Sequence, residues 1–125
     1  MNILLSNASQ DPIYIQIKKQ IKQNILKGAL IEGEPLPSMR KLAKELQISV
    51  ITTKRAYEEL EREGFIISYV GKGSFVAGQN NDLIQERRLQ MVEQGLAEIV
   101  KESKSLDITL PQLQELLAML YEEEE

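Results

Sequence analysis

The chain has 125 residues, a formal net charge of −4, 42% hydrophobic residues, and neither cysteine nor histidine. This composition predicts one small globular domain with a short appended element, and it excludes disulfides, thiolate or imidazole metal ligands and imidazole catalysis. No stretch approaches the roughly 20 apolar residues of a membrane span and the N-terminus lacks a signal-peptide pattern, so we expect a cytoplasmic protein with no membrane contact, metal or cofactor.

The first predicted helix follows Asp11 and Pro12, which suit a cap and a first-turn position, and it ends near Gly28. Every fourth residue is apolar, which gives one face that we expect to pack on the elements that follow: Ile13, Ile17, Ile21 and Ile25. The remaining surface carries Lys18, Lys19 and Lys22. These lysines face either DNA phosphates or plain solvent, and the sequence leaves both alternatives open. Residues 3–5 form a short strand or a packing arm.

Two short helices joined by a tight turn are predicted next. Ser38 and Ser49 each suit an N-cap, because a serine hydroxyl accepts a hydrogen bond from a free backbone N–H group at a helix start. After each cap, apolar or small residues recur at i, i+3, i+4 and i+7: Met39, Leu42, Ala43 and Leu46 in the first helix, and Thr53, Ala56, Tyr57 and Leu60 in the second. Gln47 and Ile48 form the turn, and Gly64 ends the second helix.

Charge divides the second of these helices. Its N-terminal half exposes Val50, Ile51, Thr52, Lys54 and Arg55. Its C-terminal half carries Glu58, Glu59, Glu61 and Glu63. Because phosphates repel carboxylates, we expect the helix to meet DNA with its N-terminal end.

A β-hairpin is predicted after the second helix. Residues 65–76 are rich in β-formers, and Gly71, Lys72 and Gly73 supply a turn that allows positive φ. We expect Lys72 to reach DNA phosphates or the minor groove, with the glycines permitting close approach; a plain solvent-exposed turn is the alternative. Two helices followed by a hairpin predict a winged helix-turn-helix, in a chain that is mainly α with a small β-hairpin.

Residues 10–78 resemble the DNA-binding domain of GntR-type bacterial transcription regulators. The resemblance is carried by motifs at fixed offsets: Leu36-Pro37-Ser38-x-Arg40-x-Leu42-Ala43, Ser49-x-x-Thr52, Ala56-Tyr57-x-x-Leu60-x-x-x-Gly64 and Gly71-x-Gly73-Ser74-Phe75-Val76. The short remainder resembles the YtrA subfamily. The resemblance implies DNA contacts from Arg40, from residues 49–55 and from Gly73. Many relatives carry arginine or proline at the position of Val50, so the operator sequence is not implied.

A polar junction at residues 79–82 separates the predicted DNA-binding domain, residues 1–78, from a helical region, residues 79–125. The sequence of that region predicts a long amphipathic helix, followed by a last helix capped by Thr109 and Gln112. The last helix carries an apolar stripe of Leu113, Leu116, Leu117 and Leu120. Two helices cannot enclose a core alone, so we expect a homodimer that presents two recognition helices to a palindromic site. Packing against the winged helix of the same chain is the alternative.

Charge is uneven between these regions. Residues 1–79 contain 11 Lys+Arg and 8 Asp+Glu, whereas residues 80–125 contain 4 and 11. The first part is therefore mildly basic, and we expect a local patch rather than global charge to drive DNA affinity. For the terminal run of Glu122 to Glu125 the sequence favours a solvated tail over competition with DNA for that patch.

These features predict a sequence-specific transcription regulator bound to double-stranded DNA, and no group of residues indicates an enzyme. Repression and control by a small-molecule effector rest on the resemblance alone. An effector pocket would be lined by residues such as Met91, Leu96, Leu117 and Met119, although ordinary packing of the methionines is favoured. A winged helix that binds proteins instead of specific DNA is the alternative function. The predicted DNA-binding residues are Ser38, Arg40, Ser49, Val50, Ile51, Thr52, Lys54, Arg55, Lys72 and Gly73.

Overall fold

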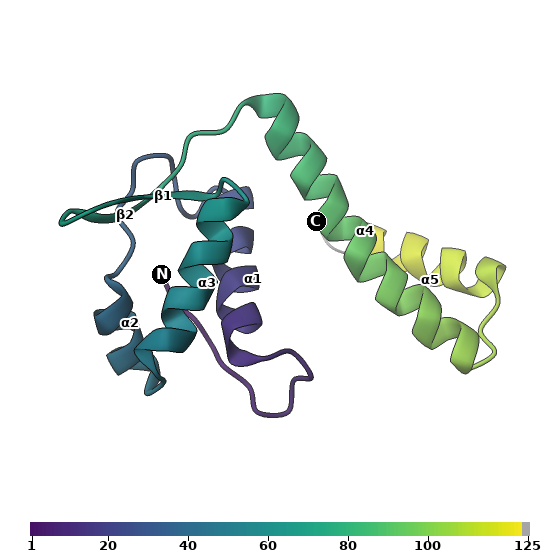
Figure 1. Ribbon diagram of the computed structural model, residues 1–125. Helices are drawn as coiled ribbons and strands as arrows, with labels where there is room; N and C mark the ends of the chain where they lie inside the picture. Colours follow the sequence, from purple (N-terminus) through teal and green to yellow (C-terminus); the bar gives the residue numbers. More distant parts are fainter. Residues whose placement is uncertain (124–125) are drawn as a thin grey trace. The chain divides into compact units, whose positions relative to one another are not determined.

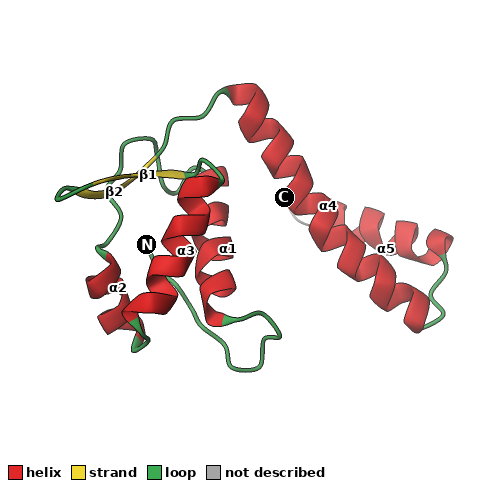
Figure 2. Ribbon diagram, in the orientation of Figure 1, coloured by secondary structure: helices red, strands yellow, loops and turns green. Residues whose placement is uncertain are grey.

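The computed structural model describes residues 1–123. Within that range it contains five helices and one antiparallel pair of strands (Figure 1; Figure 2): α1 (Ile13–Leu26), α2 (Met39–Leu46), α3 (Val50–Arg62), β1 (Ile66–Tyr69), β2 (Gly73–Val76), α4 (Asn81–Ser105) and α5 (Leu110–Glu123). The predicted fold class is confirmed. Contacts divide the chain into a first unit, Met1–Ile84, and a second unit that begins at Gln85. Glu124 and Glu125 of the terminal acidic run lie outside the described residues.

The core of the first unit is built from α1, α3 and the hairpin. Its most deeply buried side chains are Tyr57, Phe65, Ile17, Ile21, Leu60, Ile66 and Thr53. All four residues predicted for the inner face of α3 are buried. In α1 the middle of the predicted row is buried, whereas Ile13 and Ile25 at its ends are half-buried. A step of four residues overshoots a 3.6-residue turn, so the ends of such a row rotate away from the core.

Serine side chains begin α2 and α3 as predicted. Ser38 Oγ accepts a hydrogen bond from the Lys41 N–H group at 3.1 Å, and Ser49 Oγ accepts one from the Thr52 N–H group at 3.1 Å. Gly64 follows the end of α3 with a φ of 82°. The predicted boundaries of these two helices are therefore confirmed, and both caps stabilise helix starts that lie at the predicted DNA surface.

The turn between α2 and α3 depends on one left-handed residue. Gln47 has a φ of 57° and a ψ of 47°, and the Ile48 N–H group then donates to the Ala43 carbonyl oxygen at 3.0 Å. The left-handed conformation costs an L-residue about 1–2 kcal/mol, and glycine is the usual residue at such a helix end. The sequence predicted a turn here, but no glycine marked its conformation.

The start of α1 differs from the prediction. Pro12 occupies the N-cap position without any side-chain cap, and Asp11 instead pairs with Lys19, with 2.8 Å between Oδ2 and Nζ. Asp11 lies one residue before the cap position, so its carboxylate is not placed to accept from the first free N–H groups of the helix. The Gln16 side chain donates to the Asp11 carbonyl oxygen at 3.0 Å and fixes the chain as it enters α1.

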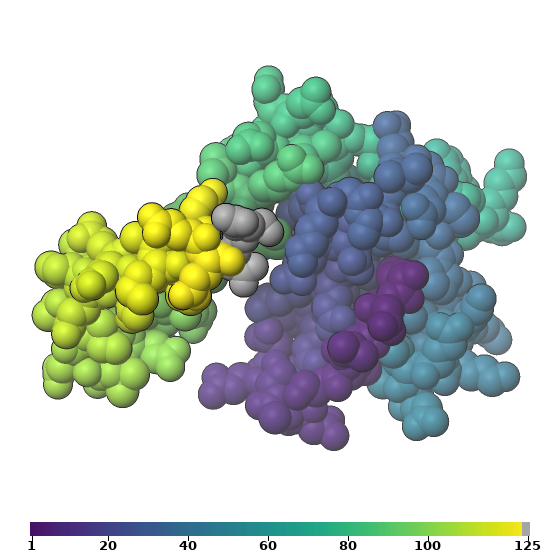
Figure 3. Space-filling view, turned by 180° about the vertical axis from the view of Figure 1, so that it is seen from behind, coloured from purple at the N-terminus to yellow at the C-terminus, as the bar shows by residue number. Residues whose placement is uncertain are grey.

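The residues before α1 form a packing arm, seen in darkest purple across the first unit in Figure 3. Ile3 is buried. Gln20 of α1 accepts a hydrogen bond from the Leu4 N–H group at 2.8 Å and donates one to the Leu4 carbonyl oxygen at 2.7 Å. Gln16 makes the same two bonds with Ser6. Side chains of α1 thus take the place of a neighbouring strand.

The hairpin is anchored along both edges of β2. β1 and β2 pair antiparallel, with Tyr69 opposite Gly73 at the end of the ladder. The Lys72 N–H group closes the turn on the Tyr69 carbonyl oxygen at 3.0 Å. Along the other edge of β2, the segment before α2 adds further bonds, including one from the Leu36 N–H group to the Ser74 carbonyl oxygen at 2.9 Å. The hairpin base is therefore fixed to the segment that leads into α2.

The second unit contains most of α4 and the described part of α5. Thr109 and Gln112 form the predicted capping box: Gln112 Oε1 accepts from the Thr109 N–H group at 2.9 Å, and Thr109 Oγ1 accepts from the Gln112 N–H group at 3.3 Å. Ser103 is the buried residue of α4, and no described residue of α5 is buried. Large apolar side chains are instead exposed on both helices: Leu89, Val92, Leu96, Ile99, Val100, Leu116, Leu117, Met119 and Leu120.

None of the helices in residues 1–123 has both the length and the apolar character needed to cross a membrane. The same residues contain no group of three or more acidic side chains placed to hold a metal ion.

We expect Gln47→Gly to raise the free energy of unfolding by about 0.5–1 kcal/mol, because glycine adopts positive φ without a steric penalty. Gln23→Gly, on the exposed side of α1, is the control and should lower the free energy of unfolding. Urea unfolding followed by circular dichroism measures both. An equal loss of stability in the two variants would contradict the left-handed turn.

Candidate nucleic-acid interface

A buried tyrosine of α3 holds the start of α2. The Tyr57 hydroxyl donates a hydrogen bond to the Pro37 carbonyl oxygen at 2.8 Å, and Tyr57 is 1% exposed. Burial, with a smaller contribution from the Glu45 carboxylate, raises the pKa of Tyr57 well above its ordinary value, so the hydroxyl stays protonated and able to donate. Next to this bond, Ser38 caps α2, and Arg40 lies exposed in the first turn.

The first turn of α3 presents two hydroxyls and two apolar side chains. The Ser49 and Thr52 hydroxyl oxygens are 2.8 Å apart, so one donates to the other, and Ser49 also caps the helix. Val50 is 43% exposed and Ile51 is 80% exposed. Apolar contact with a thymine methyl group is one of the ways in which a helix reads the major groove, and these side chains are available for it.

Lys54 and Arg55 are held to different degrees. Lys54 Nζ lies 3.8 Å from Glu58 Oε1, and both side chains are more than half exposed, so this pair is weak. Arg55 Nε lies 3.5 Å from Glu59 Oε2, and the Arg55 guanidinium carbon lies 3.9 Å from the centre of the Tyr14 ring in α1. Lys54 is therefore readily available to a phosphate, whereas Arg55 is fixed by side chains from two helices.

Two rows of side chains at four-residue spacing join α1 to α3. The row on α1 is Tyr14, Lys18 and Lys22, and the row on α3 is Arg55, Glu59 and the C-cap residue Glu63. Lys18 Nζ lies 3.0 Å from Glu59 Oε1 and 2.9 Å from Glu63 Oε2, and Lys22 Nζ lies 2.9 Å from Glu63 Oε1. These six residues form the α1–α3 clasp. Tyr14 faces Arg55, Lys18 faces Glu59 and Lys22 faces Glu63. The order is the same along both helices, so the two helices run in the same direction.

For Lys18 and Lys22 the clasp agrees with neither alternative that the sequence left open, whereas Lys19 lies on the exposed helix surface with its side chain 55% exposed. Lys18 and Lys22 have side chains that are 17% and 29% exposed, and both pair with glutamates of α3. Lys19 pairs with an aspartate before α1. The acidic half of α3 also holds the hairpin, because Glu61 accepts a hydrogen bond from the Ser68 N–H group at 2.8 Å. The carboxylates that would repel phosphate thus have structural partners.

Ionisation follows these pairs. Burial opposes the charges of Lys18 and Glu63, but their hydrogen bonds and charge interactions outweigh it, so the pKa of Lys18 is raised and the pKa of Glu63 is lowered. The hydrogen bond from Lys18 also lowers the pKa of Glu59. All three groups are charged at neutral pH, so the ion pairs of the clasp are formed at that pH.

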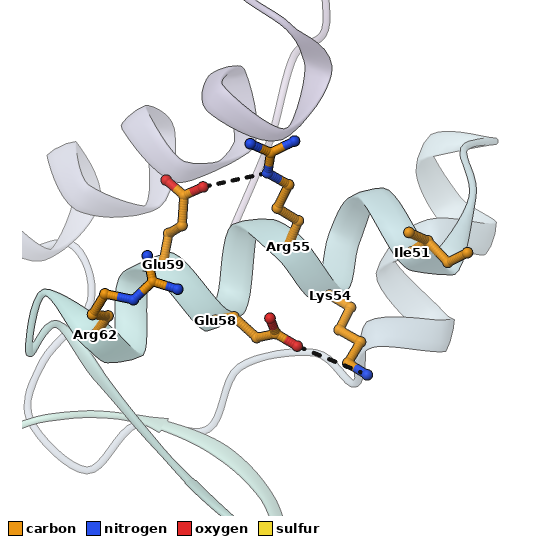
Figure 4. Close-up of a pocket in the computed structure, with 6 residues that line it drawn as sticks. All are labelled: Ile51, Lys54, Arg55, Glu58, Glu59 and Arg62. Carbon is orange, nitrogen blue, oxygen red and sulfur yellow. Dashed lines mark ion pairs between the residues drawn. The ribbon is translucent and has the colours of Figure 1, made fainter.

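A shallow hollow of about 480 Å³ runs along the exposed side of α3 (Figure 4). It is lined by Ile51, Lys54, Arg55, Glu58, Glu59 and Arg62. Figure 4 shows Arg55 directed toward α1 and Lys54 directed away from it, toward Glu58. The lining residues carry both signs of charge, and the hollow is open to solvent along α3. It is therefore a shallow surface groove and not an enclosed ligand pocket.

The hairpin tip carries Lys72 between two glycines. Gly71 and Gly73 have φ values of 76° and 100°, which L side chains rarely adopt. A Cβ atom on either glycine would meet no other atom within 4 Å, so the backbone conformation and not crowding requires glycine here. Lys72 is exposed, and Figure 1 shows the tip projecting from the first unit on the side where α2 lies.

The predicted DNA-binding residues thus gather in three places within the first unit: the start of α2, the first turns of α3 and the hairpin tip. Of their cations, Arg40 and Lys72 form no ion pair with any residue in the described range. They are therefore the cations most readily available to a phosphate or a base edge.

Residues 13–76 match the family described as bacterial regulatory proteins, gntR family. The chain belongs to this family. Over 113 residues it is 33% identical to the HTH-type transcriptional repressor YtrA of Bacillus subtilis (strain 168), an alignment that covers 90% of this chain and 87% of that relative. The predicted membership and the resemblance to YtrA are both confirmed.

Solved structures of GntR regulators share the fold. A GntR family transcriptional regulator from Listeria monocytogenes superposes with a TM-score of 0.77 at 26% identity, covering 92% of this chain and 98% of that one. The DNA-binding domain of AraR in complex with operator ORX1 superposes with a TM-score of 0.55 at 26% identity, covering 62% of this chain and 96% of that one. This GntR chain is therefore a transcription regulator with a winged helix-turn-helix DNA-binding domain, and its relatives are regulators rather than enzymes.

Sequence reasoning missed Tyr14. The available signal was its position four residues before Lys18, which matches the spacing of Arg55 and Glu59. A row on one helix does not identify the row that it meets on another, because that depends on how the helices are packed. The structure supplies this packing.

We expect Glu63→Gln to lower the melting temperature near pH 7 and to lower it less as the pH falls. The pKa of Glu63 is lowered in the folded chain. Its carboxylate therefore stabilises the fold above the unfolded-state pKa, and this contribution is lost as the pH falls through the folded-state pKa. Scanning calorimetry between about pH 3 and about pH 7 measures the difference, with Glu98→Gln on the exposed surface of α4 as control. A difference that stays constant over this range would contradict the clasp.

Proposed function

We propose that this GntR regulator is a cytoplasmic repressor that binds a palindromic operator as a homodimer. The observation that carries the proposal is the set of exposed side chains at the first turns of α3, together with an exposed Arg40 that forms no ion pair within residues 1–123, in a fold shared with an operator-bound domain. Repression is supported by the similarity to the repressor YtrA, which matches this chain over most of both lengths.

In this proposal the N-terminal turns of α3 enter the major groove. Ile51 and Thr52 face base edges, and Arg40 contacts a base edge or an adjacent phosphate. Lys54 forms only a weak, exposed ion pair with Glu58, and it contacts a DNA phosphate. Lys72 lies along the backbone or in the minor groove, as its place on the hairpin tip allows. Specificity comes from α2 and α3, and affinity is shared with the hairpin.

The homodimer is proposed because the second unit does not bury its own apolar surface. Leu116, Leu117 and Leu120 are 47%, 52% and 58% exposed in a single chain, and α4 exposes a comparable stripe. Exposed apolar stripes of this size on a small protein mark an interaction surface. A second copy supplies the same stripes, and a twofold dimer presents two α3 helices to two halves of a palindrome. Residues 79–125 are therefore proposed as the dimerisation region.

A binding pocket for a small-molecule effector in the second unit would form only in the same dimer. Of the four residues predicted to line its pocket, Met119 is 52% exposed and Met91 is half-buried in a single chain. A second copy of the chain would have to enclose a ligand placed there. Packing of both methionines in the dimer interface accounts for the same positions, and we propose that role for them.

We expect Arg40→Ala to weaken binding to a duplex selected by the protein from random sequence, at a loss of about 1–3 kcal/mol, and to relax preference at one position. Lys54→Ala and Lys72→Ala should weaken binding to all sequences and each reduce the salt slope by about one. Fluorescence anisotropy at several salt concentrations measures these effects, and Lys104→Ala on α4 is the control. If the wild type does not bind the duplex, or if Arg40→Ala binds it as tightly as the wild type, the protein-interaction alternative would be favoured.

We expect the paired substitution Leu117→Asp and Leu120→Asp to convert a dimer into a monomer, because two buried carboxylates per chain would oppose association. Sedimentation equilibrium of the full chain measures the mass, and Glu115→Gln on the same helix is the control. DNA affinity should fall in the monomer since two half-sites are no longer joined. A charged variant that remains a tight dimer would place the interface elsewhere.

A further inference from the structure

We infer that Tyr14 of α1 is a positioning residue for DNA recognition, because it holds the Arg55 guanidinium ready for a phosphate or base edge. The inference rests on the proposed function and extends the site to α1, which contributes none of the ten residues in the predicted DNA-binding set. It assigns Tyr14 no contact with DNA of its own. Its role is to limit where Arg55 can be before DNA arrives.

Two different interactions restrict the Arg55 side chain. The Tyr14 ring lies under the guanidinium, with 3.9 Å from the guanidinium carbon to the ring centre. The Glu59 carboxylate lies 3.5 Å from Nε, at the inner end of the same group. An aromatic face and a carboxylate together fix both the plane and the rotation of a guanidinium.

The outer end of the same guanidinium remains available. Neither terminal nitrogen of Arg55 is hydrogen-bonded to a residue that the structure describes, and the side chain is 61% exposed. Figure 4 shows these two nitrogens beyond the atom that faces Glu59. The two terminal NH₂ groups are the ones that an arginine uses in a bidentate contact with phosphate or guanine. The Nε edge of the Arg55 guanidinium is thus held by Glu59, and the edge with the two terminal nitrogens is left available to DNA.

The carboxylate that contacts Arg55 is itself held by a second partner. The Glu59 carboxylate is shared, with Oε1 on Lys18 at 3.0 Å and Oε2 toward Arg55, and its side chain is only 19% exposed. Lys54, one residue earlier on α3, has only the exposed partner Glu58 at 3.8 Å. Arginine and lysine both lose substantial side-chain freedom when they bind a ligand. Arg55 has lost part of this freedom already in the folded chain, whereas Lys54 has not.

The test is a double-mutant cycle on the full chain, read as affinity for the selected duplex. Tyr14→Phe keeps the aromatic face, and Tyr14→Leu keeps apolar bulk without it. We expect Tyr14→Leu to weaken binding by about two- to fivefold, and Tyr14→Phe to bind as wild type. In an Arg55→Ala background the Tyr14→Leu change should have no further effect, because the group it positions is gone.

Melting temperatures of all four variants separate positioning from folding. A merely structural role predicts that the loss caused by Tyr14→Leu persists in full in the Arg55→Ala background, and this result would overturn the inference. Wild-type affinity in Tyr14→Leu would overturn it as well. Arg40→Ala in the same assay tests the proposed function separately: an arginine-dependent shift without any effect at Tyr14 leaves the function standing, and no binding by the wild type overturns both.

Discussion

The α1–α3 clasp is the interaction on which the rest of the first unit depends. Lys18, partly buried, is neutralised by two carboxylates, and it joins α1 to α3 in a parallel arrangement. Partly buried ion pairs stabilise a structure only when each charge has a partner with good geometry, and the clasp meets this condition. Once α3 is fixed, Tyr57 places the start of α2 and Glu61 places β1. The three surfaces proposed to meet DNA are therefore all positioned through one helix.

The same constraint explains how an acidic chain presents a basic surface. Glu59 and Glu63 are directed to lysines of α1, and Glu61 is directed to the hairpin, whereas Glu58 lies near Lys54 of its own helix. Of the four cations in the predicted DNA-binding set, Arg40 and Lys72 are left without carboxylate partners among the described residues. Net charge is thus a poor guide to DNA binding here, and the distribution of ion pairs is the better one.

Much of the fold was predictable because its signals are local. Serine caps, the glycine after α3 and the glycines of the hairpin each determine a backbone conformation from one or two residues. The failures have physical reasons. Asp11 lies one residue too early to cap α1. Gln47 adopts a left-handed conformation, although the sequence has no glycine at this position to indicate it. The clasp, and Tyr14 with it, depends on two helices 41 residues apart in sequence, and the spacing within one helix does not contain that information.

The most direct test of this account is to map the DNA contact residue by residue with amide chemical shifts, adding the selected duplex to the ¹⁵N-labelled full chain. The account predicts that the largest changes fall at residues 38–41, at residues 49–55 and at residues 71–73, with small changes in the C-terminal half of α3. Changes concentrated in that half of α3, or confined to the second unit, would contradict the proposed docking and the positioning role given to the clasp.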